Sequence, residues 1–135
     1  MATIRKETTI DVPVDTVWGA LRDYGALHEL AVGFVTATEM DGGDRLVTFA
    51  NGTILRERPI SIDDEARRLS WTIVDGPYAH HNGVAQVFSE PDGDGDGRAR
   101  FVWTADLLPD ETAQPTAEAM EIGTQAIKRE LERRS

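Results

Sequence analysis

The sequence contains no cysteine, and this absence removes several kinds of chemistry at once. Disulfide bonds, thiolate metal ligands and a cysteine nucleophile are excluded, and such a chain suits a reducing compartment. The sequence also has no apolar run near the roughly 18 residues of a membrane span, and its first residues contain no signal-peptide core. We therefore expect a soluble, cytoplasmic protein that does not insert into a membrane.

Positive charge is scarce as well. Lys and Arg number 14 against 24 Asp and Glu, which gives a formal net charge of −10 at pH 7. A field of this sign repels phosphate backbones and anionic lipid headgroups. The composition therefore argues against a nucleic-acid or membrane-surface partner, and it leaves the oligomeric state open.

Motifs for cofactors and activated nucleophiles are absent too. The sequence has no Gly-x-Ser-x-Gly, P-loop or dinucleotide-binding glycine pattern. His80 and His81 are neighbours in a strand-like run, so their side chains point to opposite faces and cannot share one metal ion. We expect no cofactor and no metal site.

One segment resembles the beginning of an EF-hand calcium loop. Asp92, Asp94 and Asp96 match the first three ligand positions, and Gly97 matches the turn glycine. The last position, which must provide a bidentate glutamate, is Trp103. We interpret the segment as a hydrated hairpin tip that does not bind calcium.

The chain does contain β-rich runs that end in one long helical pattern. Its 135 residues suit one domain over residues 1–135. Periodicity predicts a strand at residues 2–11, two short helices between residues 13 and 30, and a hairpin turn at Asn51-Gly52. Further strands are expected at residues 33–40, 45–50, 53–62, 69–74, 80–89 and 98–107.

The last segment has a single apolar stripe at helical spacing, made of Ala113, Ala117, Met120, Thr124, Ile127 and Leu131. An antiparallel meander needs its apolar face covered, and only this helix is long enough to cover it. We therefore predict an α+β fold in which a seven-stranded curved antiparallel sheet wraps around a long C-terminal helix.

Alternation along the strands predicts which residues face inward. In the two clearest strands these are Leu69, Trp71, Ile73, Phe101, Trp103, Ala105 and Leu107. If the same alternation continues through the Asn51-Gly52 turn, the residues that face inward there are Val47, Phe49, Leu55, Arg45 and Glu57. An inner charge is costly unless it is paired or hydrated, so the last two suggest an ion pair at the wall of a polar-lined cavity.

A second phase fits this hairpin equally well. In this alternative, the inward residues are Ile54, Ile60 and Ile62. Glu57 then lies on a solvated surface beside Arg56 and Arg58. A β-bulge changes the phase without a sequence sign, so the burial of Glu57 decides between the two. Small residues of the last helical segment also allow two interpretations, namely room for a ligand or close packing on the sheet. They are Ala113, Ala117, Gly123 and Thr124.

Residues 51–83 carry the most specific resemblance to a known family. The motifs Arg-Glu-Arg, Asp-Asp, Arg-Leu-Ser-Trp and Val-Asp-Gly-Pro follow one another there. They resemble the START-like helix-grip superfamily (SRPBCC), which includes polyketide cyclases and dehydrases, lipid carriers, birch-pollen allergen relatives and abscisic acid receptors. The resemblance covers nearly the whole chain.

The resemblance implies roles for individual residues. Arg45 and Glu57 would face a ligand cavity, Trp71 would be an aromatic wall, and Tyr78 would lie in a loop that closes over the ligand. Gly83 stands where the hormone receptors have a pocket tyrosine, and a tight turn replaces their long gate loop. Hormone sensing is therefore not implied.

Two functions follow. The first is binding of a small hydrophobic or aromatic molecule, polyketide- or lipid-like, between the sheet and the C-terminal helix. The expected ligand-binding residues are Arg45, Val47, Phe49, Leu55, Glu57, Trp71, Tyr78, Gly83, Ala85, Val87, Trp103, Met120, Thr124 and Ile127. The second is a polyketide aromatase/cyclase or dehydratase in which Glu57 is the general base and Arg45 or Tyr78 stabilises an enolate. A tight Arg45–Glu57 pair would favour binding.

Overall fold

The computed structural model describes residues 1–90 and 97–135. In this part of the chain, seven strands form one antiparallel sheet in the order β1-β7-β6-β5-β4-β3-β2. The strands are β1 Ala2–Ile10, β2 Val35–Asp41, β3 Asp44–Phe49, β4 Ile54–Asp63, β5 Arg68–Val74, β6 His80–Ser89 and β7 Ala99–Leu108. Strands β2 to β7 form a meander, and β1 pairs with the last of them.

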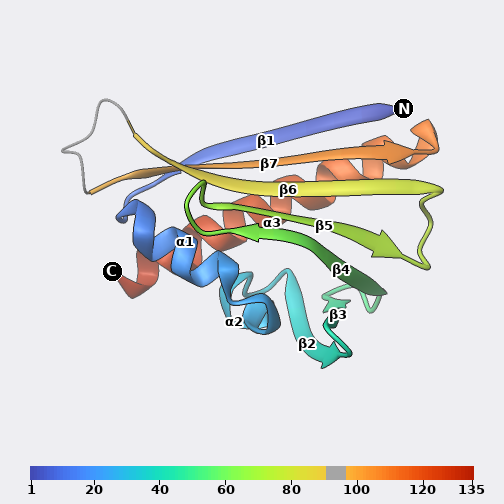
Figure 1. The fold of residues 1–135 in the computed structure, drawn as a ribbon, viewed down its shortest axis with the longest axis horizontal. Helices are drawn as coiled ribbons and strands as arrows, with labels where there is room; N and C mark the ends of the chain where they lie inside the picture. The colour runs from blue at the N-terminus through green and yellow to red at the C-terminus, as the bar shows by residue number, and fades with distance from the viewer. Residues whose placement is uncertain (91–96) are drawn as a thin grey trace.

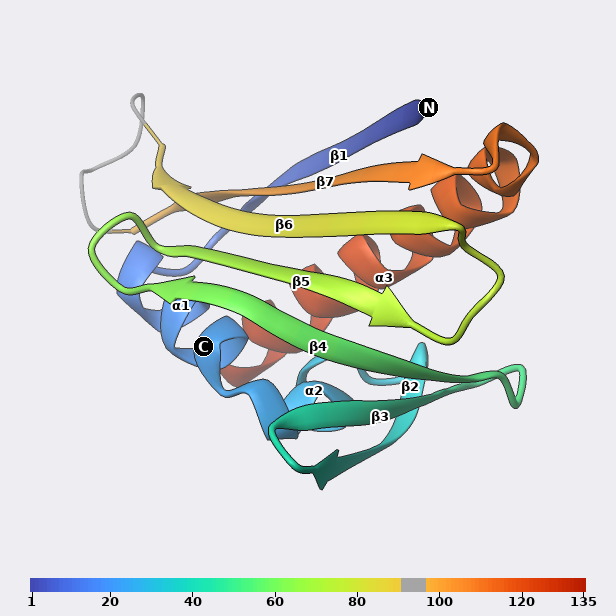
Figure 2. The same cartoon turned by 45° about the vertical axis from the view of Figure 1, so that its right-hand side comes forward.

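Helices cover one face of this sheet (Figure 1). They are α1 Val14–Arg22, η1 Tyr24–Ala26 and α2 Leu27–Leu30 after β1, and η2 Asp110–Thr112 and α3 Ala113–Arg134 at the C-terminus. Figure 2 shows α3 running diagonally behind the sheet, with its last turns beside α1 and α2. The predicted α+β architecture, including the two short helices after the first strand, is confirmed.

The core forms where the inner face of the sheet meets α1 and α3. Its largest fully buried side chains are Phe101, Ile10, Leu107, Met120 and Leu131. The inward phase predicted for β5 and β7 is confirmed at Leu69 and Phe101, which are 2% and 1% exposed. Burying these apolar surfaces is the main favourable contribution to folding.

Strand ends differ from the sequence prediction by one or two residues. The largest shift is at β2, which begins at Val35 and not at Gly33. Gly33 has a φ of +89°, and the Phe34 amide donates to the carbonyl of Ala31, so this stretch is a turn. A glycine in the left-handed region marks a turn more strongly than the alternation around it marks a strand.

Burial decides the phase of β4 in favour of Glu57. Glu57 is 6% exposed, whereas Ile54 and Ile60 are 61% and 58% exposed. The register against β5 shifts between Pro59 and Ser61, and Ile60 is the extra residue at this bulge. The alternative in which the isoleucines face inward is therefore wrong.

The sequence motifs for ions and membranes have these outcomes. Asp92, Asp94 and Asp96 of the calcium-like segment lie outside the described residues. Within residues 1–90 and 97–135, no group of three or more His, Asp or Glu side chains is arranged to hold a metal ion. None of the helices in those same ranges is long and apolar enough to cross a membrane.

Candidate ligand-binding site

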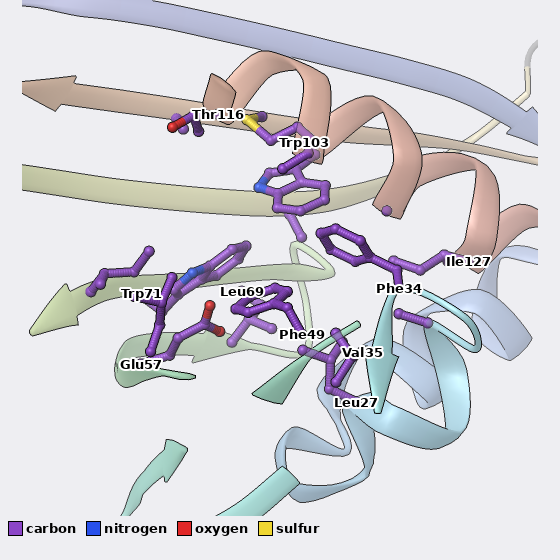
Figure 3. Close-up of a pocket in the computed structure, with 18 of the residues that line it drawn as sticks. Leu27, Phe34, Val35, Phe49, Glu57, Leu69, Trp71, Trp103, Thr116 and Ile127 are labelled. Atoms are coloured by element: carbon purple, nitrogen blue, oxygen red, sulfur yellow. The ribbon is translucent and has the colours of Figure 1, made fainter. Parts of the chain in front are cut away.

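A cavity of about 110 Å³ lies between the inner face of the sheet and α3. Its wall is mainly apolar and aromatic, and Figure 3 shows Phe34, Phe49, Trp71 and Trp103 around it. Leu27 of α2 and the start of β2 close one side. An apolar hollow with a few convergent polar groups is the usual form of a small-molecule site.

The structure brings most of the predicted site residues together around this cavity. The predicted residues that line it are Arg45, Phe49, Leu55, Glu57, Trp71, Tyr78, Ala85, Trp103, Met120 and Ile127. The other predicted residues, Val47, Gly83, Val87 and Thr124, are buried but are not part of the cavity wall in the described structure. Val47 and Val87 belong to the hydrophobic core, and Thr124 is fully buried in α3.

Gly83 has a packing role. It pairs with Trp71 across β5 and β6. A Cβ atom at Gly83 would lie 2.8 Å from Cε2 of Trp71 and 3.1 Å from Cε1 of His81. Because glycine leaves this space free, the Trp71 ring can lie across β6 beside the imidazole.

Several residues of the wall were not predicted from the sequence. His81 lies four residues before the predicted Ala85 in the same strand, so alternation along that strand could have found it. Thr116 lies one helical turn before Met120, and helical spacing could have found it. Leu21, Leu27, Ala31, Phe34 and Val35 reach the cavity through the packing of α1, α2 and β2 against α3, which no local pattern reveals.

The main charged feature of the cavity is a buried ion pair. Arg45 of β3 and Glu57 of β4 are direct cross-strand partners. Nε of Arg45 donates to Oε1 of Glu57 at 2.9 Å, and Nη2 of Arg45 lies 2.8 Å from the same oxygen. The two side chains are only 4% and 8% exposed, so little water screens their attraction.

Tyr24 holds this pair in place from η1. Nη1 of Arg45 donates to the Tyr24 carbonyl at 3.1 Å, and the guanidinium lies 3.8 Å from the centre of the Tyr24 ring. The Tyr24 hydroxyl donates to the carbonyl oxygen of Glu57 at 3.0 Å. Burial raises the pKa of Tyr24, so its hydroxyl keeps the proton that it donates.

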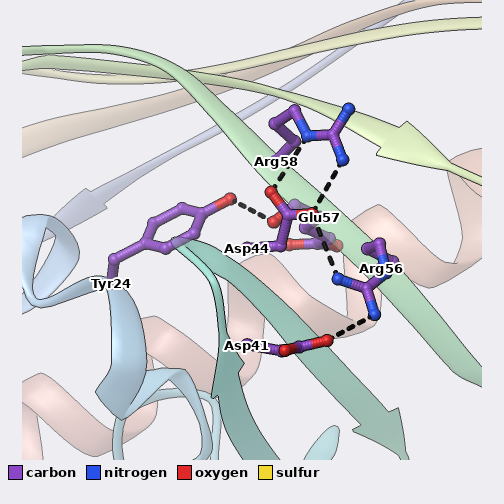
Figure 4. A network of polar contacts seen from close by, with 6 residues as sticks. All are labelled: Tyr24, Asp41, Asp44, Arg56, Glu57 and Arg58. Carbon is purple, nitrogen blue, oxygen red and sulfur yellow. Dashed lines mark hydrogen bonds and ion pairs between the residues drawn. The ribbon is translucent and has the colours of Figure 1, made fainter.

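A second ionic network fixes the same hairpin on its outer face (Figure 4). Arg58 donates to both carboxylate oxygens of Asp44, at 3.0 and 2.9 Å. Arg56 donates to Asp44 at 3.1 Å and to Asp41 at 2.7 Å. The hydrogen bond from Arg58 is the main cause that lowers the pKa of Asp44. The outer arginines thus pair with aspartates, and Arg45 remains the partner of Glu57.

A second polar group lies on β6. His81 is 6% exposed, and its Nδ1 accepts a hydrogen bond from the Ile73 amide at 3.3 Å. Burial, and then the nearby charge of His80, lower the pKa of His81 to about 4, so the imidazole is neutral at pH 7. The Tyr78 ring centre lies 5.1 Å from the imidazole, and the Tyr78 hydroxyl shares a 2.8 Å hydrogen bond with Thr116 of α3. This contact joins the loop after β5 to the helix.

At Gly123, the absence of a side chain brings α3 close to two aromatic rings. A Cβ atom at Gly123 would lie 2.8 Å from Cε2 of Phe34 and 2.9 Å from Cζ3 of Trp103. Of the two interpretations of the small residues, close packing therefore applies at this position. The cavity volume lies beside Gly123 and is bounded by these two rings.

Gly123→Ala is expected to lower the free energy of unfolding by about 1 kcal/mol, because overpacking against two rings outweighs the helix preference of alanine. The matched control is Gly19→Ala in α1, where nothing lies within 4 Å of the added methyl group. That control should stabilise the protein by roughly 0.5–1 kcal/mol. Urea denaturation of both variants measures the difference, and changes of equal sign would contradict the packing role of Gly123.

Comparisons with solved structures identify the same architecture. The chain matches an uncharacterized protein from Bacillus thuringiensis with a TM-score of 0.83 and 16% identity, over 96% of this chain and 98% of that one. It matches a Thermobifida fusca protein solved by NMR with a TM-score of 0.77 and 28% identity, over 98% and 95%. It also matches norcoclaurine synthase from Thalictrum flavum, a point mutant in complex with a transition-state analogue, with a TM-score of 0.70 and 21% identity, over 99% and 96%.

A search of curated proteins gave no match. The family model described as "Polyketide cyclase / dehydrase and lipid transport" matches residues 1–134. This match covers the sheet, the covering helices and the cavity between them. The chain therefore belongs to the polyketide cyclase/dehydrase and lipid-transport family.

Proposed function

We propose that this protein binds a small apolar, aromatic molecule in the cavity between the sheet and α3. The observation that supports this most directly is the composition of the wall, in which six Phe, Trp and Tyr rings and several aliphatic side chains surround one buried ion pair. Apolar surface supplies affinity in such a site, and the few polar groups orient the ligand. The family match supports the same general function.

The volume of the cavity limits the size of the ligand. An engineered cavity of about 150 Å³ in another protein accommodates benzene. A cavity of about 110 Å³ is of the same order, so it limits the ligand to a single ring with small substituents. A longer polyketide- or lipid-like molecule would need the wall to move.

A second candidate function is a cyclase or dehydratase with Glu57 as general base. Family membership and the likeness to norcoclaurine synthase favour it, although the identity of 21% makes that likeness one of fold. Against it stands the ion pair, because Arg45 already occupies Oε1 of Glu57 at 2.8–2.9 Å. Because a buried arginine already engages this oxygen, the geometry favours binding over proton abstraction.

Binding is tested with a library of single-ring compounds, using thermal shift and then calorimetry. Ligands of the cavity should raise the melting temperature through preferential binding to the folded state. Trp71→Phe is expected to weaken binding several-fold, since it removes part of the apolar wall. Trp18→Phe is the matched control, because Trp18 is buried outside the cavity wall. Equal effects of the two substitutions, or no ligand in the library, would contradict the proposal.

Glu57→Gln separates the two functions. If the protein only binds, the variant keeps ligand and its affinity changes modestly. If Glu57 is a general base, turnover falls by orders of magnitude while ligand is retained. The measurement is product formation by mass spectrometry alongside calorimetry on the same preparation.

A further inference from the structure

On the inner face of the sheet, the polar residues Glu57 and His81 lie on either side of the apolar residue Ile73. Glu57 on β4 pairs with Ile73 on β5, and Trp71 pairs with Gly83 on β6. Continuing the antiparallel register by two residues sets His81 beside Ile73, where the Ile73 amide donates to the imidazole. Because neighbouring strands lie about 4.8 Å apart, the backbones at Glu57 and His81 are roughly 10 Å apart.

Each of the two polar side chains is held through one atom. Glu57 uses Oε1 to bind Arg45, and residues 1–90 and 97–135 supply no hydrogen bond to Oε2. His81 uses Nδ1 to accept from Ile73, so the neutral ring carries its proton on Nε2, for which the same residues supply no acceptor. Both side chains line the cavity, and Glu57 and His81 as whole residues are each 6% exposed. One side of the cavity thus offers an acceptor, and the other offers a donor.

The charges around the cavity cancel. Arg45 and Glu57 carry opposite charges and are paired, and His81 is neutral near pH 7 because burial lowers its pKa to about 4. The hydroxyls of Tyr78 and Thr116 beside His81 bind one another and add no charge. An ionised ligand would therefore be buried without a counter-charge, which is strongly unfavourable.

We propose that the ligand is a compact, electrically neutral aromatic molecule that donates a hydrogen bond to Oε2 of Glu57 at one end and accepts one from Nε2 of His81 at the opposite end. This inference rests on the proposed binding function and narrows its ligand class. A para-disubstituted six-membered ring meets both requirements, with its apolar faces against the wall that Trp71 and Trp103 contribute.

The test uses isothermal calorimetry with four probes of similar size near pH 7. Para-aminoacetophenone is neutral and carries a donor and an acceptor at opposite ends, and its meta isomer has the same groups in another direction. Para-aminobenzoate is the anionic counterpart, and para-cymene has neither polar group. We expect the para ketone to bind about 5-fold more tightly than its meta isomer, as one hydrogen bond provides. We expect the anion to bind about 100-fold more weakly than the ketone, because its charge is buried unpaired.

His81→Leu tests the hydrogen bond that the ligand accepts from Nε2 of His81. The substitution should weaken para-aminoacetophenone about 5-fold and leave para-cymene unchanged or slightly tighter. If this variant does not fold, the four probes on the unaltered protein still decide the matter. Tight binding of para-aminobenzoate, or equal binding of the para and meta ketones, would overturn the inference while leaving the binding function in place. Failure of all four probes, para-cymene included, would overturn the binding function itself.

Discussion

Replacing Arg45 with methionine is expected to lower the free energy of unfolding by about 3–5 kcal/mol, because Glu57 would remain buried without its partner. The two side chains are 4% and 8% exposed, so water cannot take the place of the guanidinium. The variant also loses the hydrogen bond to the Tyr24 carbonyl and the stacking on the Tyr24 ring. Urea denaturation monitored by tryptophan fluorescence measures the change.

Two further variants show whether burial causes this loss. Arg5→Met breaks the exposed pair of Arg5 with Glu7, whose side chains are 56% and 45% exposed, and should cost less than about 1 kcal/mol. The double variant Arg45→Met/Glu57→Leu removes both charges and should recover most of the stability. A loss at Arg45 no larger than that at Arg5 would mean that the pair is hydrated in solution.

The second large effect is a pH dependence that arises from His81. Burial lowers the pKa of His81 from 6.5 to about 4, so the unfolded chain takes up the proton first as the pH falls. Stability is therefore complete above the unfolded pKa and is lost as the pH falls toward the folded value. Between about pH 7.5 and 4.5 the loss is on the order of 2–3 kcal/mol, and it can be measured by urea denaturation across this range.

The control variants isolate this residue. His81→Gln should make the stability nearly independent of pH over the same range. His80→Gln should keep most of the slope, because burial is the largest cause of the His81 shift and His80 is exposed. Below this range Glu130 contributes its own loss, since Arg133 and Arg134 lower its pKa to about 2. A slope that survives His81→Gln unchanged would show that another group titrates.

The two predictions concern the two ends of the same cavity. Arg45 fixes one oxygen of Glu57, and Ile73 fixes one nitrogen of His81. These two contacts stabilise the fold, and they leave Oε2 of Glu57 and Nε2 of His81 available to a ligand. A ligand that donates to Glu57 and accepts from His81 would add contacts without disturbing either one.

Strands and the covering helix were predictable because their patterns are local. Alternation placed Leu69, Trp71 and Phe101 inside, and helical spacing placed Met120 and Ile127 on one stripe. The inward direction of Arg45 and Glu57 was one of two phases that fitted the alternation equally well. The family resemblance favoured the phase that burial confirms.

By itself, the sequence determined the fold class, the strand order along the chain and the inner faces of β5 and β7, since each depends on the period of side chains along one element. Tertiary structure alone decided the phase of β4, because the bulge beyond Pro59 leaves no mark in the sequence. It also decided that Gly83 and Gly123 are sites of close packing by aromatic rings. The cavity wall depended on it most, because Leu27 and Phe34 come from α2 and the turn before β2, and only the packing of these segments against α3 and the sheet brings them to the same cavity as Trp103.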